Sequence, residues 1–326
     1  MQTDNLALTV FLFLVGMVLT IKGGDFFVDA ASWIAERSGI PKLIIGATIV
    51  SLATTLPEML VSVMAAVQGK VDMSIGNAVG SVTANLGLIM ALAVIFMPGV
   101  IRRKDYLLKS ILMLLASAII VLCGLRGSVS VAMCVVLLVI FAVYLWENVR
   151  EACHTIRLNG QQPAAEAIAA ETAGKKVVLL NVVKFIGGAA AIVIGAQLLV
   201  NNGSTLARLA GISERVIGVT LVAIGTSLPE LITTITAISK KQSELSVGNI
   251  LGANILDLTL IMPLSSLISG KPLPVSATMA AIDLPACLLV GFIATIPALV
   301  SKRFARWQGV VLLAVYAGYV VLTCTR

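Results

Sequence analysis

The sequence predicts an all-α polytopic membrane protein with about ten transmembrane helices in two inverted five-helix repeats. Three observations predict this class. Of the 326 residues, 59% are hydrophobic and 12% are charged, about half the charge of ordinary soluble domains. The apolar residues form ten long segments, and one polar motif occurs twice, once in each half. A soluble protein of this length has too little interior for so much apolar sequence, whereas a bilayer accommodates it.

Each apolar segment is long enough for a helix to cross the hydrocarbon core, which takes about 20 residues. Their predicted boundaries are 6–36, 43–68, 72–97, 106–125, 128–148, 177–207, 215–239, 244–269, 273–299 and 305–324. The first and sixth are long and contain polar residues, so we expect these two helices to tilt. The first segment lacks the basic region and cleavage site of a signal peptide and is interpreted as a retained span.

The connections between segments alternate in basic charge. Fifteen Lys and Arg residues fall on one side and six on the other. Because cytosolic loops carry the excess of positive charge, both termini are predicted to be periplasmic in a bacterial inner membrane. The connection 149–176 is then a cytosolic linker between a first repeat, 1–148, and a second, 177–326. The sequence contains no basic stretch with interleaved aromatic residues, the pattern that would indicate nucleic-acid binding.

The internal repeat aligns without gaps. GATIVSLATTLPE at 46–58 matches GVTLVAIGTSLPE at 218–230, a shift of 172 residues. The same shift aligns IGNAVGSVTANLGLIM at 75–90 with VGNILGANILDLTLIM at 247–262. Matched Pro, Glu, Asn, Thr and Gly residues in one register do not result from apolar composition. An odd number of helices separates equivalent points, which predicts opposite orientations for the halves and a substrate site near the bilayer midplane.

Two glutamates, Glu58 and Glu230, end the repeated motif and lie deep within apolar segments. An unpaired ionised carboxylate is costly there, and neither motif contains a Lys or Arg. Each carboxyl group must therefore be protonated or bound to a cation. A proline precedes each glutamate and removes a helical donor, which is expected to free a carbonyl for a polar cavity or an ion.

The helix after each glutamate carries further polar residues, spaced four apart on one face. In the first half these are Asn77, Ser81 and Asn85, matched in the second half by Asn249, Ala253 and Asp257. Both Glu58 to Asn85 and Glu230 to Asp257 span 27 residues, as a helix–turn–helix that folds back would allow. The glycines of the two GN-x-x-G segments are interpreted as allowing close helix packing.

The candidate ligands are carboxylate, hydroxyl, amide and carbonyl oxygens. Such a set suits hard cations such as Ca²⁺, Mg²⁺ or Na⁺, and a flexible site of about six to eight oxygens favours Ca²⁺ over Mg²⁺. Glu58, Glu230 and Asp257 together can offset one divalent or several monovalent ions. The five cysteines form no CxxC pair and the single histidine, His154, lies in a polar connection, so no thiolate metal site or cofactor is predicted.

At these residues the sequence resembles the Ca²⁺/cation antiporter superfamily, specifically sodium/calcium exchanger-type proteins and their YrbG-type bacterial branch. The resemblance covers essentially the whole chain and rests on the doubled T-(T/S)-L-P-E motif with the downstream GN-x-x-G. It implies ten helices and alternating access, in which the long first and sixth helices move against the rest. It also implies ion ligands at Ser51, Thr54, Thr55, Glu58, Ser81, Asn85, Ala223, Thr226, Ser227, Glu230 and Asp257, with backbone carbonyls used at Ser51 and Ala223.

The chain departs from the family pattern at two triplets. The family usually has Gly-Ser-Asn at both, whereas this chain has Gly-Ser-Val at 80–82 and Gly-Ala-Asn at 252–254. Ala253 therefore removes a hydroxyl and Val82 removes an amide. The linker also lacks the large calcium-sensing region of animal exchangers. Glutamates expected within the GN-x-x-G segment of proton/calcium exchangers are absent, which favours Na⁺ over H⁺ as the coupling ion.

The implied function is secondary active exchange of Ca²⁺ against Na⁺ at a mid-membrane carboxylate site, without covalent chemistry. The expected partners are membrane lipid and the transported cations, with no obligatory protein partner evident. Ca²⁺/H⁺ or K⁺-dependent exchange on the same fold, a passive channel, and an intramembrane enzyme with paired glutamates stay open as alternatives. An enzyme acting on lipid diphosphates should place Lys or Arg near a phosphate, yet the only such residues within spans, Lys22 and Lys184, lie outside the repeated motif.

Overall fold

The computed structural model describes residues 6–69, 71–99, 103–159, 175–211, 225, 227–270 and 272–325. Over these residues the chain is almost wholly helical, and nine of its helices are long and apolar enough to cross a membrane. The predicted all-α polytopic class is therefore confirmed. Of the predicted seventh segment, 215–239, mainly the second part is described, as the helix α12 (Leu228–Ser239).

The helical spans are built from α-helices and short π-helical turns (η), with two short strands in the connections. The first half contains α1 (Leu6–Ser38), α2 (Lys42–Ile45), η1 (Gly46–Val50), α3 (Ser51–Val67), α4 (Val71–Ala84), η2 (Asn85–Met90), α5 (Ala91–Phe96), α6 (Arg103–Leu125), β1 (Ser128–Val129) and α7 (Val131–Asn159). The second half contains α9 (Lys175–Leu209), α12, α13 (Ser243–Leu256), η4 (Asp257–Ile261), α14 (Met262–Ser269), β2 (Leu273–Pro274), η5 (Met279–Asp283), α15 (Leu284–Ser301) and α16 (Arg306–Thr325).

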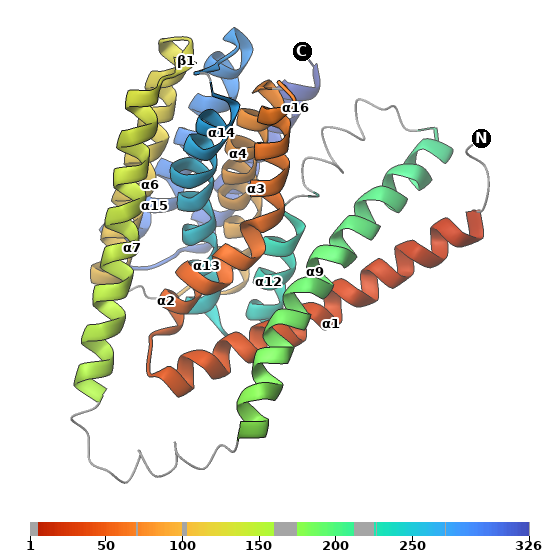
Figure 1. Ribbon diagram of the computed structural model, residues 1–326, viewed down its shortest axis with the longest axis vertical. Coiled ribbons are helices and arrows are strands. Elements are labelled where there is room, and N and C mark those ends of the chain that lie inside the picture. Colours follow the sequence, from red (N-terminus) through yellow and green to blue (C-terminus); the bar gives the residue numbers. More distant parts are fainter. Residues whose placement is uncertain are drawn as a thin grey trace.

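Successive spans cross the molecule in alternating directions (Figure 1). Helix α1 begins at the right-hand side of Figure 1 and α16 ends at the top, whereas α7 ends and α9 begins at the lower end. Helix α7 continues to Asn159, so the predicted linker at 149–176 starts as helix. Polar residues extend this helix beyond the apolar stretch because its backbone hydrogen bonds do not require apolar side chains. A pair between Arg150 and Glu147 at 3.7 Å adds an i,i+3 contact.

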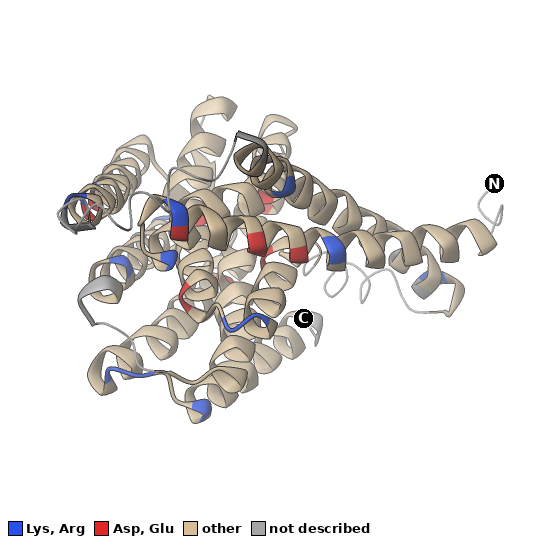
Figure 2. Cartoon of the chain, turned by 90° about the horizontal axis from the view of Figure 1, so that it is seen from below, with Lys and Arg blue, Asp and Glu red and all other residues tan. Residues whose placement is uncertain are grey.

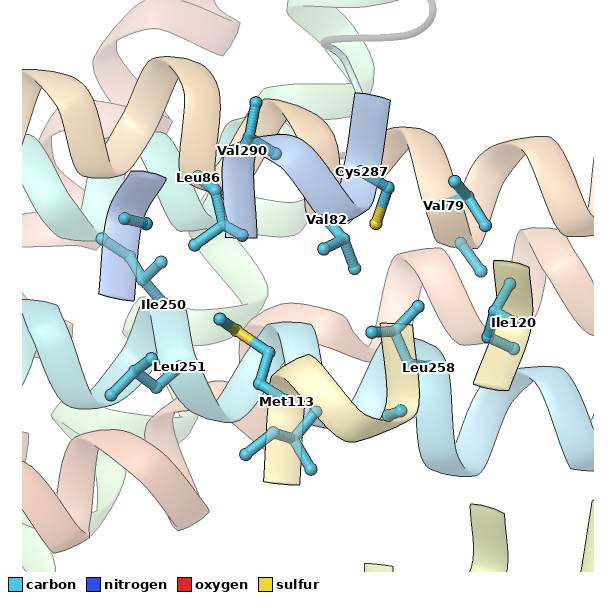
Figure 3. Packing of buried hydrophobic residues seen from close by; sticks show 14 of the residues in the cluster. Val79, Val82, Leu86, Met113, Ile120, Ile250, Leu251, Leu258, Cys287 and Val290 are labelled. Carbon is cyan, nitrogen blue, oxygen red and sulfur yellow. The ribbon is translucent and has the colours of Figure 1, made fainter. Parts of the chain in front are cut away.

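The main apolar core lies between the central helices of both halves, which interdigitate (Figure 3). Its members include Val79, Val82, Leu86, Met113, Ile120, Ile250, Leu251, Leu258, Cys287 and Val290. Among the nine described membrane-length spans, the one that contains α13, η4 and α14 is the most enclosed, with 83% of its most apolar stretch buried. The core thus surrounds α13 and η4, which carry Asn249 and Asp257 from the second copy of the repeat.

Helices α1 and α9 form a separate antiparallel pair that lies oblique to the other helices (Figure 1), in line with the expected tilt. Glycines lie where their backbones meet, with Gly16 facing Gly195 and Gly23 facing Gly188. A Cβ on Gly16 or Gly23 would lie 2.9 Å from the carbonyl oxygen of its partner. Close approach of the two backbones therefore depends on these small residues.

Charged residues lie mainly at helix ends, in connections and along α1 (Figure 2). Lys240, which follows α12, ties the α1–α9 pair to the bundle. The Lys240 Nζ atom lies 2.8 Å from Asp29 Oδ1 and 3.4 Å from Asp25 Oδ1 on α1. At the opposite end, β1 and β2 pair antiparallel and join the α6–α7 connection to the one after α14. The sequence did not predict these two-residue strands.

Candidate ion-binding site

Helices α3 and α12 position the two repeated glutamates. Pro57 lies inside α3, which continues through it as one helix. Pro229 lies in the first turn of α12, where a missing N–H has no helical partner to lose. Glu230 consequently sits in that first turn, where the partial positive charge of a helix N-terminus favours a carboxylate. The same motif therefore gives two different backbone settings for Glu58 and Glu230.

The two glutamates lie near each other where α3 contacts α12. The Thr55 hydroxyl donates to Glu230 Oε1 at 3.3 Å, and Ser227 lies beside the Glu58 carboxylate. Glu58 and Glu230 are each 1% exposed. Asp257 is fully buried and close enough for electrostatic interaction with both. The three carboxylates thus belong to one buried cluster drawn from both halves of the chain.

A π-helical turn begins at each of the equivalent residues Asn85 and Asp257. A π-turn inserts a residue into the helix, shifts the register of the side chains that follow, and occurs frequently at functional sites. The two turns, η2 and η4, start 172 residues apart, which is the shift of the internal alignment. Sequence periodicity did not predict them, since a single inserted residue within a uniformly apolar span leaves no clear break in the pattern.

The carboxylate cluster is poor in protein hydrogen bonds. Within the described part of the chain, five of its six side-chain oxygens lack a partner: Oε1 and Oε2 of Glu58, Oε2 of Glu230, and Oδ1 and Oδ2 of Asp257. No Lys or Arg among the described residues forms an ion pair with any of them. Buried polar atoms in proteins are almost always satisfied, so this concentration of free acceptors indicates a site for a donor or a cation.

Amide side chains hold the neighbouring helices in place. Asn77 Nδ2 donates to the Glu58 carbonyl oxygen at 3.1 Å and to Ser62 Oγ at 2.9 Å. The Thr54 hydroxyl lies 3.2 Å from Asn249 Oδ1 and 3.3 Å from the Ser51 carbonyl oxygen. The hydroxyl can donate to one of these at a time, and its lone pairs stay available to an ion.

The predicted ligands differ in how directly the structure connects them to the carboxylates. Thr55 and Ser227 contact or adjoin a glutamate, as described above. Ser51 and Thr54 are linked to each other, and Ser81 is buried with its Oγ unpartnered among the described residues. Asn85 is 1% exposed with its Oδ1 unpartnered in the same part of the chain. Thr226 and Ala223 lie outside the described residues.

Asp, Glu, His and Cys side chains alone do not form a metal site here. Among the described residues, no group of three such side chains is arranged to hold a metal ion. An ion at the cluster would therefore need oxygens from hydroxyls, amides or carbonyls in addition to carboxylates. Hard cations such as Na⁺ and Ca²⁺ accept such mixed oxygen sets.

Close packing of α13 against α2, η1 and α3 brings the two halves together at the site. A Cβ on Gly248 would collide with the Leu43 carbonyl oxygen, and one on Gly252 would lie 2.6 Å from the Ala47 carbonyl oxygen. The packing interpretation is therefore confirmed for these two glycines. Their counterparts, Gly76 and Gly80, meet no comparable backbone within the described residues.

The chain is similar to known membrane proteins over most of its length. The family described as sodium/calcium exchanger protein matches residues 8–149 and 180–325. The inner membrane protein YrbG of Escherichia coli is 35% identical over 262 residues, 79% of each chain. The sodium/calcium exchanger MaX1 of Methanosarcina acetivorans is 29% identical over 360 aligned positions, covering 95% of this chain and 96% of that one.

Solved structures show the same fold. A structure of the sodium-calcium exchanger NCX_Mj, soaked with Na⁺ and Sr²⁺, is 30% identical, has a TM-score of 0.79, and is matched over 97% of this chain and 99% of its own. The likeness thus extends over all spans and both copies of the repeated motif. This chain belongs to the sodium/calcium exchanger family of membrane proteins.

Proposed function

We propose that this protein is a secondary active antiporter that exchanges Ca²⁺ for Na⁺ across the membrane. The observation that carries the proposal is the set of five unpartnered oxygens on Glu58, Glu230 and Asp257, buried at the meeting point of the two halves. Cations bound there would supply the missing electrostatic partners. Membership of a family of exchangers supports transport as the function, as opposed to covalent chemistry.

The proposed ligands combine carboxylates with neutral oxygens. They are the carboxylates of Glu58, Glu230 and Asp257, the side-chain oxygens of Thr54, Thr55, Ser81, Asn85, Thr226 and Ser227, and the backbone carbonyls of Ser51 and Ala223. The described members are almost fully buried. Ca²⁺ takes about six to eight oxygens in flexible geometry, which suits a set of this size and variety.

Exchange follows from the cost of an empty site. Three carboxylates without counter-ions in the bilayer interior repel one another and lack solvation. A site that has released Ca²⁺ would therefore switch its opening from one side of the membrane to the other only after it binds other cations. The sodium/calcium exchangers among the relatives support Na⁺ as that second ion.

We further propose that residues 1–148 and 177–326 are inverted repeats that enclose the site. The antiparallel course of α1 and α9 and the family match in each half support this division. The start of α1 and the end of α16 would face the periplasm. The Lys- and Arg-rich connections at the lower end would then face the cytosol, as the distribution of basic residues favours.

The first experiment is Ca²⁺ flux into sealed proteoliposomes that contain the purified protein. Na⁺-driven flux is expected in wild type and should be lost in both Glu58→Gln and Glu230→Gln. Glu244→Gln, on an exposed part of α13, is the matched control and should transport normally. Full Ca²⁺ transport by correctly inserted Glu58→Gln and Glu230→Gln proteins would refute the proposed site.

Separate gradients identify the coupling ion. Flux driven by a H⁺ gradient alone would identify H⁺, in place of Na⁺, as the coupling ion. Flux that also requires K⁺ would indicate K⁺-dependent exchange. Saturable flux that needs an ion on the opposite side distinguishes an exchanger from a channel. No Ca²⁺ flux under any gradient, from protein that is folded and inserted, would overturn Ca²⁺ as the substrate.

A further inference from the structure

The amide of Asn85 crosses between the two halves of the chain. Its Nδ2 atom donates to Asn254 Oδ1 at 3.1 Å, while its Oδ1 atom has no partner among the described residues. Asn85 is 1% exposed and Asn254 is fully buried. The Asn85 side-chain nitrogen is therefore hydrogen-bonded to Asn254, whereas its oxygen stays available to another partner.

The orientation of Asn254 is set by the group on its other side. Asn254 Nδ2 lies 3.8 Å from the sulfur of Met113, which α6 places in the core between α4, α13 and α15 (Figure 3). A thioether accepts a weak hydrogen bond but has no proton to donate. If the Asn254 amide were reversed, its oxygen would face an atom that cannot donate. Met113 thus favours the orientation in which Asn254 presents its oxygen to Asn85.

The orientation of Asn254 in turn determines what Asn85 can offer to a cation. With the oxygen of Asn254 turned toward it, Asn85 places its NH₂ group there and keeps Oδ1 free. A reversed Asn254 would draw in Asn85 Oδ1 and release the Asn85 NH₂ group. An NH₂ group has no lone pair for a metal ion, so the free group would be unable to bind a cation.

The internal alignment gives an independent observation. At the shift of 172 residues, Asn85 corresponds to Asp257 and Asn254 corresponds to Val82. A carboxylate has two acceptor oxygens and no NH₂ group that must be hidden. Both oxygens of Asp257 are unpartnered within the described residues, and the position equivalent to Asn254 carries an apolar side chain. An amide thus stands across from the candidate ligand that is itself an amide, Asn85, whereas the equivalent position for the carboxylate Asp257 is Val82.

We propose that Asn254 is a positioning residue, which binds the Asn85 NH₂ group so that Asn85 Oδ1 faces a cation at the carboxylate cluster. The proposal rests on the proposed function, since it assumes cation binding there. Met113 acts one step further out, by fixing Asn254. This arrangement accounts for Asn at 254 and Val at the equivalent position 82.

The test measures the half-saturating Ca²⁺ concentration and the maximal flux in proteoliposomes. Asn254→Leu should raise the half-saturating concentration about 10-fold, as expected when one buried hydrogen bond that orients a ligand is lost. Maximal flux should change much less. Thr83→Val, which removes a buried hydroxyl of α4 that donates to the Val79 carbonyl oxygen, is the control and should leave the half-saturating concentration unchanged.

A double-mutant cycle separates positioning from a general structural role. If Asn254 acts through Asn85, Asn254→Leu should have no further effect on the half-saturating concentration in an Asn85→Ala background. Additive effects would overturn the proposal. Met113→Leu conserves volume and should fold even if Asn254→Leu does not; it should raise the half-saturating concentration by a smaller factor, again only when Asn85 is present.

Two failures are distinguishable. If wild type transports Ca²⁺ in a Glu230-dependent manner but Asn254→Leu and Met113→Leu both bind as wild type does, the positioning role alone is wrong. If wild type shows no Glu230-dependent Ca²⁺ flux, the proposed function is wrong and the positioning role is refuted with it.

Discussion

The span from α13 to α14 and the α1–α9 pair differ sharply in packing. In the former, 83% of the most apolar stretch is buried in the protein, compared with 17% in each helix of the pair. The candidate ligands lie on the enclosed helices and their neighbours, and none lies on α1 or α9. A smaller apolar cluster, which includes Phe27, Ile45 and Ala237, joins the pair to the bundle. The pair can therefore shift with little loss of core packing, whereas the site helices are held firmly.

The largest expected effect comes from disturbing the enclosed helices. Gly248→Leu should reduce the free energy of unfolding by about 3 kcal/mol, because its side chain must displace the backbone at Leu43 and Ala47. The apparent melting temperature in detergent and the recovery of monodisperse protein measure this loss. Gly318→Leu on α16 is the control, since its Cβ meets no described atom within 4 Å. Equal stability of the two variants would contradict the comparison.

A crosslink tests whether α1 moves against α12. A Cβ on Gly24 would lie 3.7 Å from Thr236 Cβ, within the range for a disulfide. In a cysteine-free background, oxidation of the Gly24→Cys/Thr236→Cys protein should abolish Ca²⁺ flux, and reduction should restore it, since α1 is then fixed to α12. The Thr236→Cys single variant, oxidised in the same way, is the control and should keep most of the flux. Full flux through the oxidised double variant would contradict movement of α1 against α12.

The smallest effect is expected at the ion pairs between α12 and α1. Lys240 and its partners Asp25 and Asp29 are partly exposed, and such pairs contribute about 1 kcal/mol or less. Lys240→Gln should therefore change the half-saturating Ca²⁺ concentration by less than about fivefold, and less still at high salt. Lys241→Gln is the neighbouring control. A large effect of Lys240→Gln would mean that the pair is held mainly by charge.

Several features could be predicted from the sequence because they follow from local rules of the bilayer. A buried span needs about 20 apolar residues, which predicted nine of the described spans to within a few residues at most ends. The extension of α7 to Asn159 was missed because polar residues can continue a helix outside the membrane. Glu58 and Glu230 were recognisable since an unpaired acid within an apolar span is costly.

Other features depend on groups far apart in the chain. The role of Asn254 could not be predicted, because its partners, Asn85 and Met113, lie 169 and 141 residues away. Nor could the π-turns that begin at Asn85 and Asp257, which the apolar periodicity does not reveal.

The sequence by itself therefore determined the membrane class, the duplicated motif and its two glutamates, Glu58 and Glu230, which have no Lys or Arg in the motif beside them. These depend on composition and spacing, which the low dielectric of the bilayer constrains strongly. Only the tertiary structure decided which carboxylate and amide oxygens stay free, because hydrogen bonds between side chains depend on contacts that only the folded helices create.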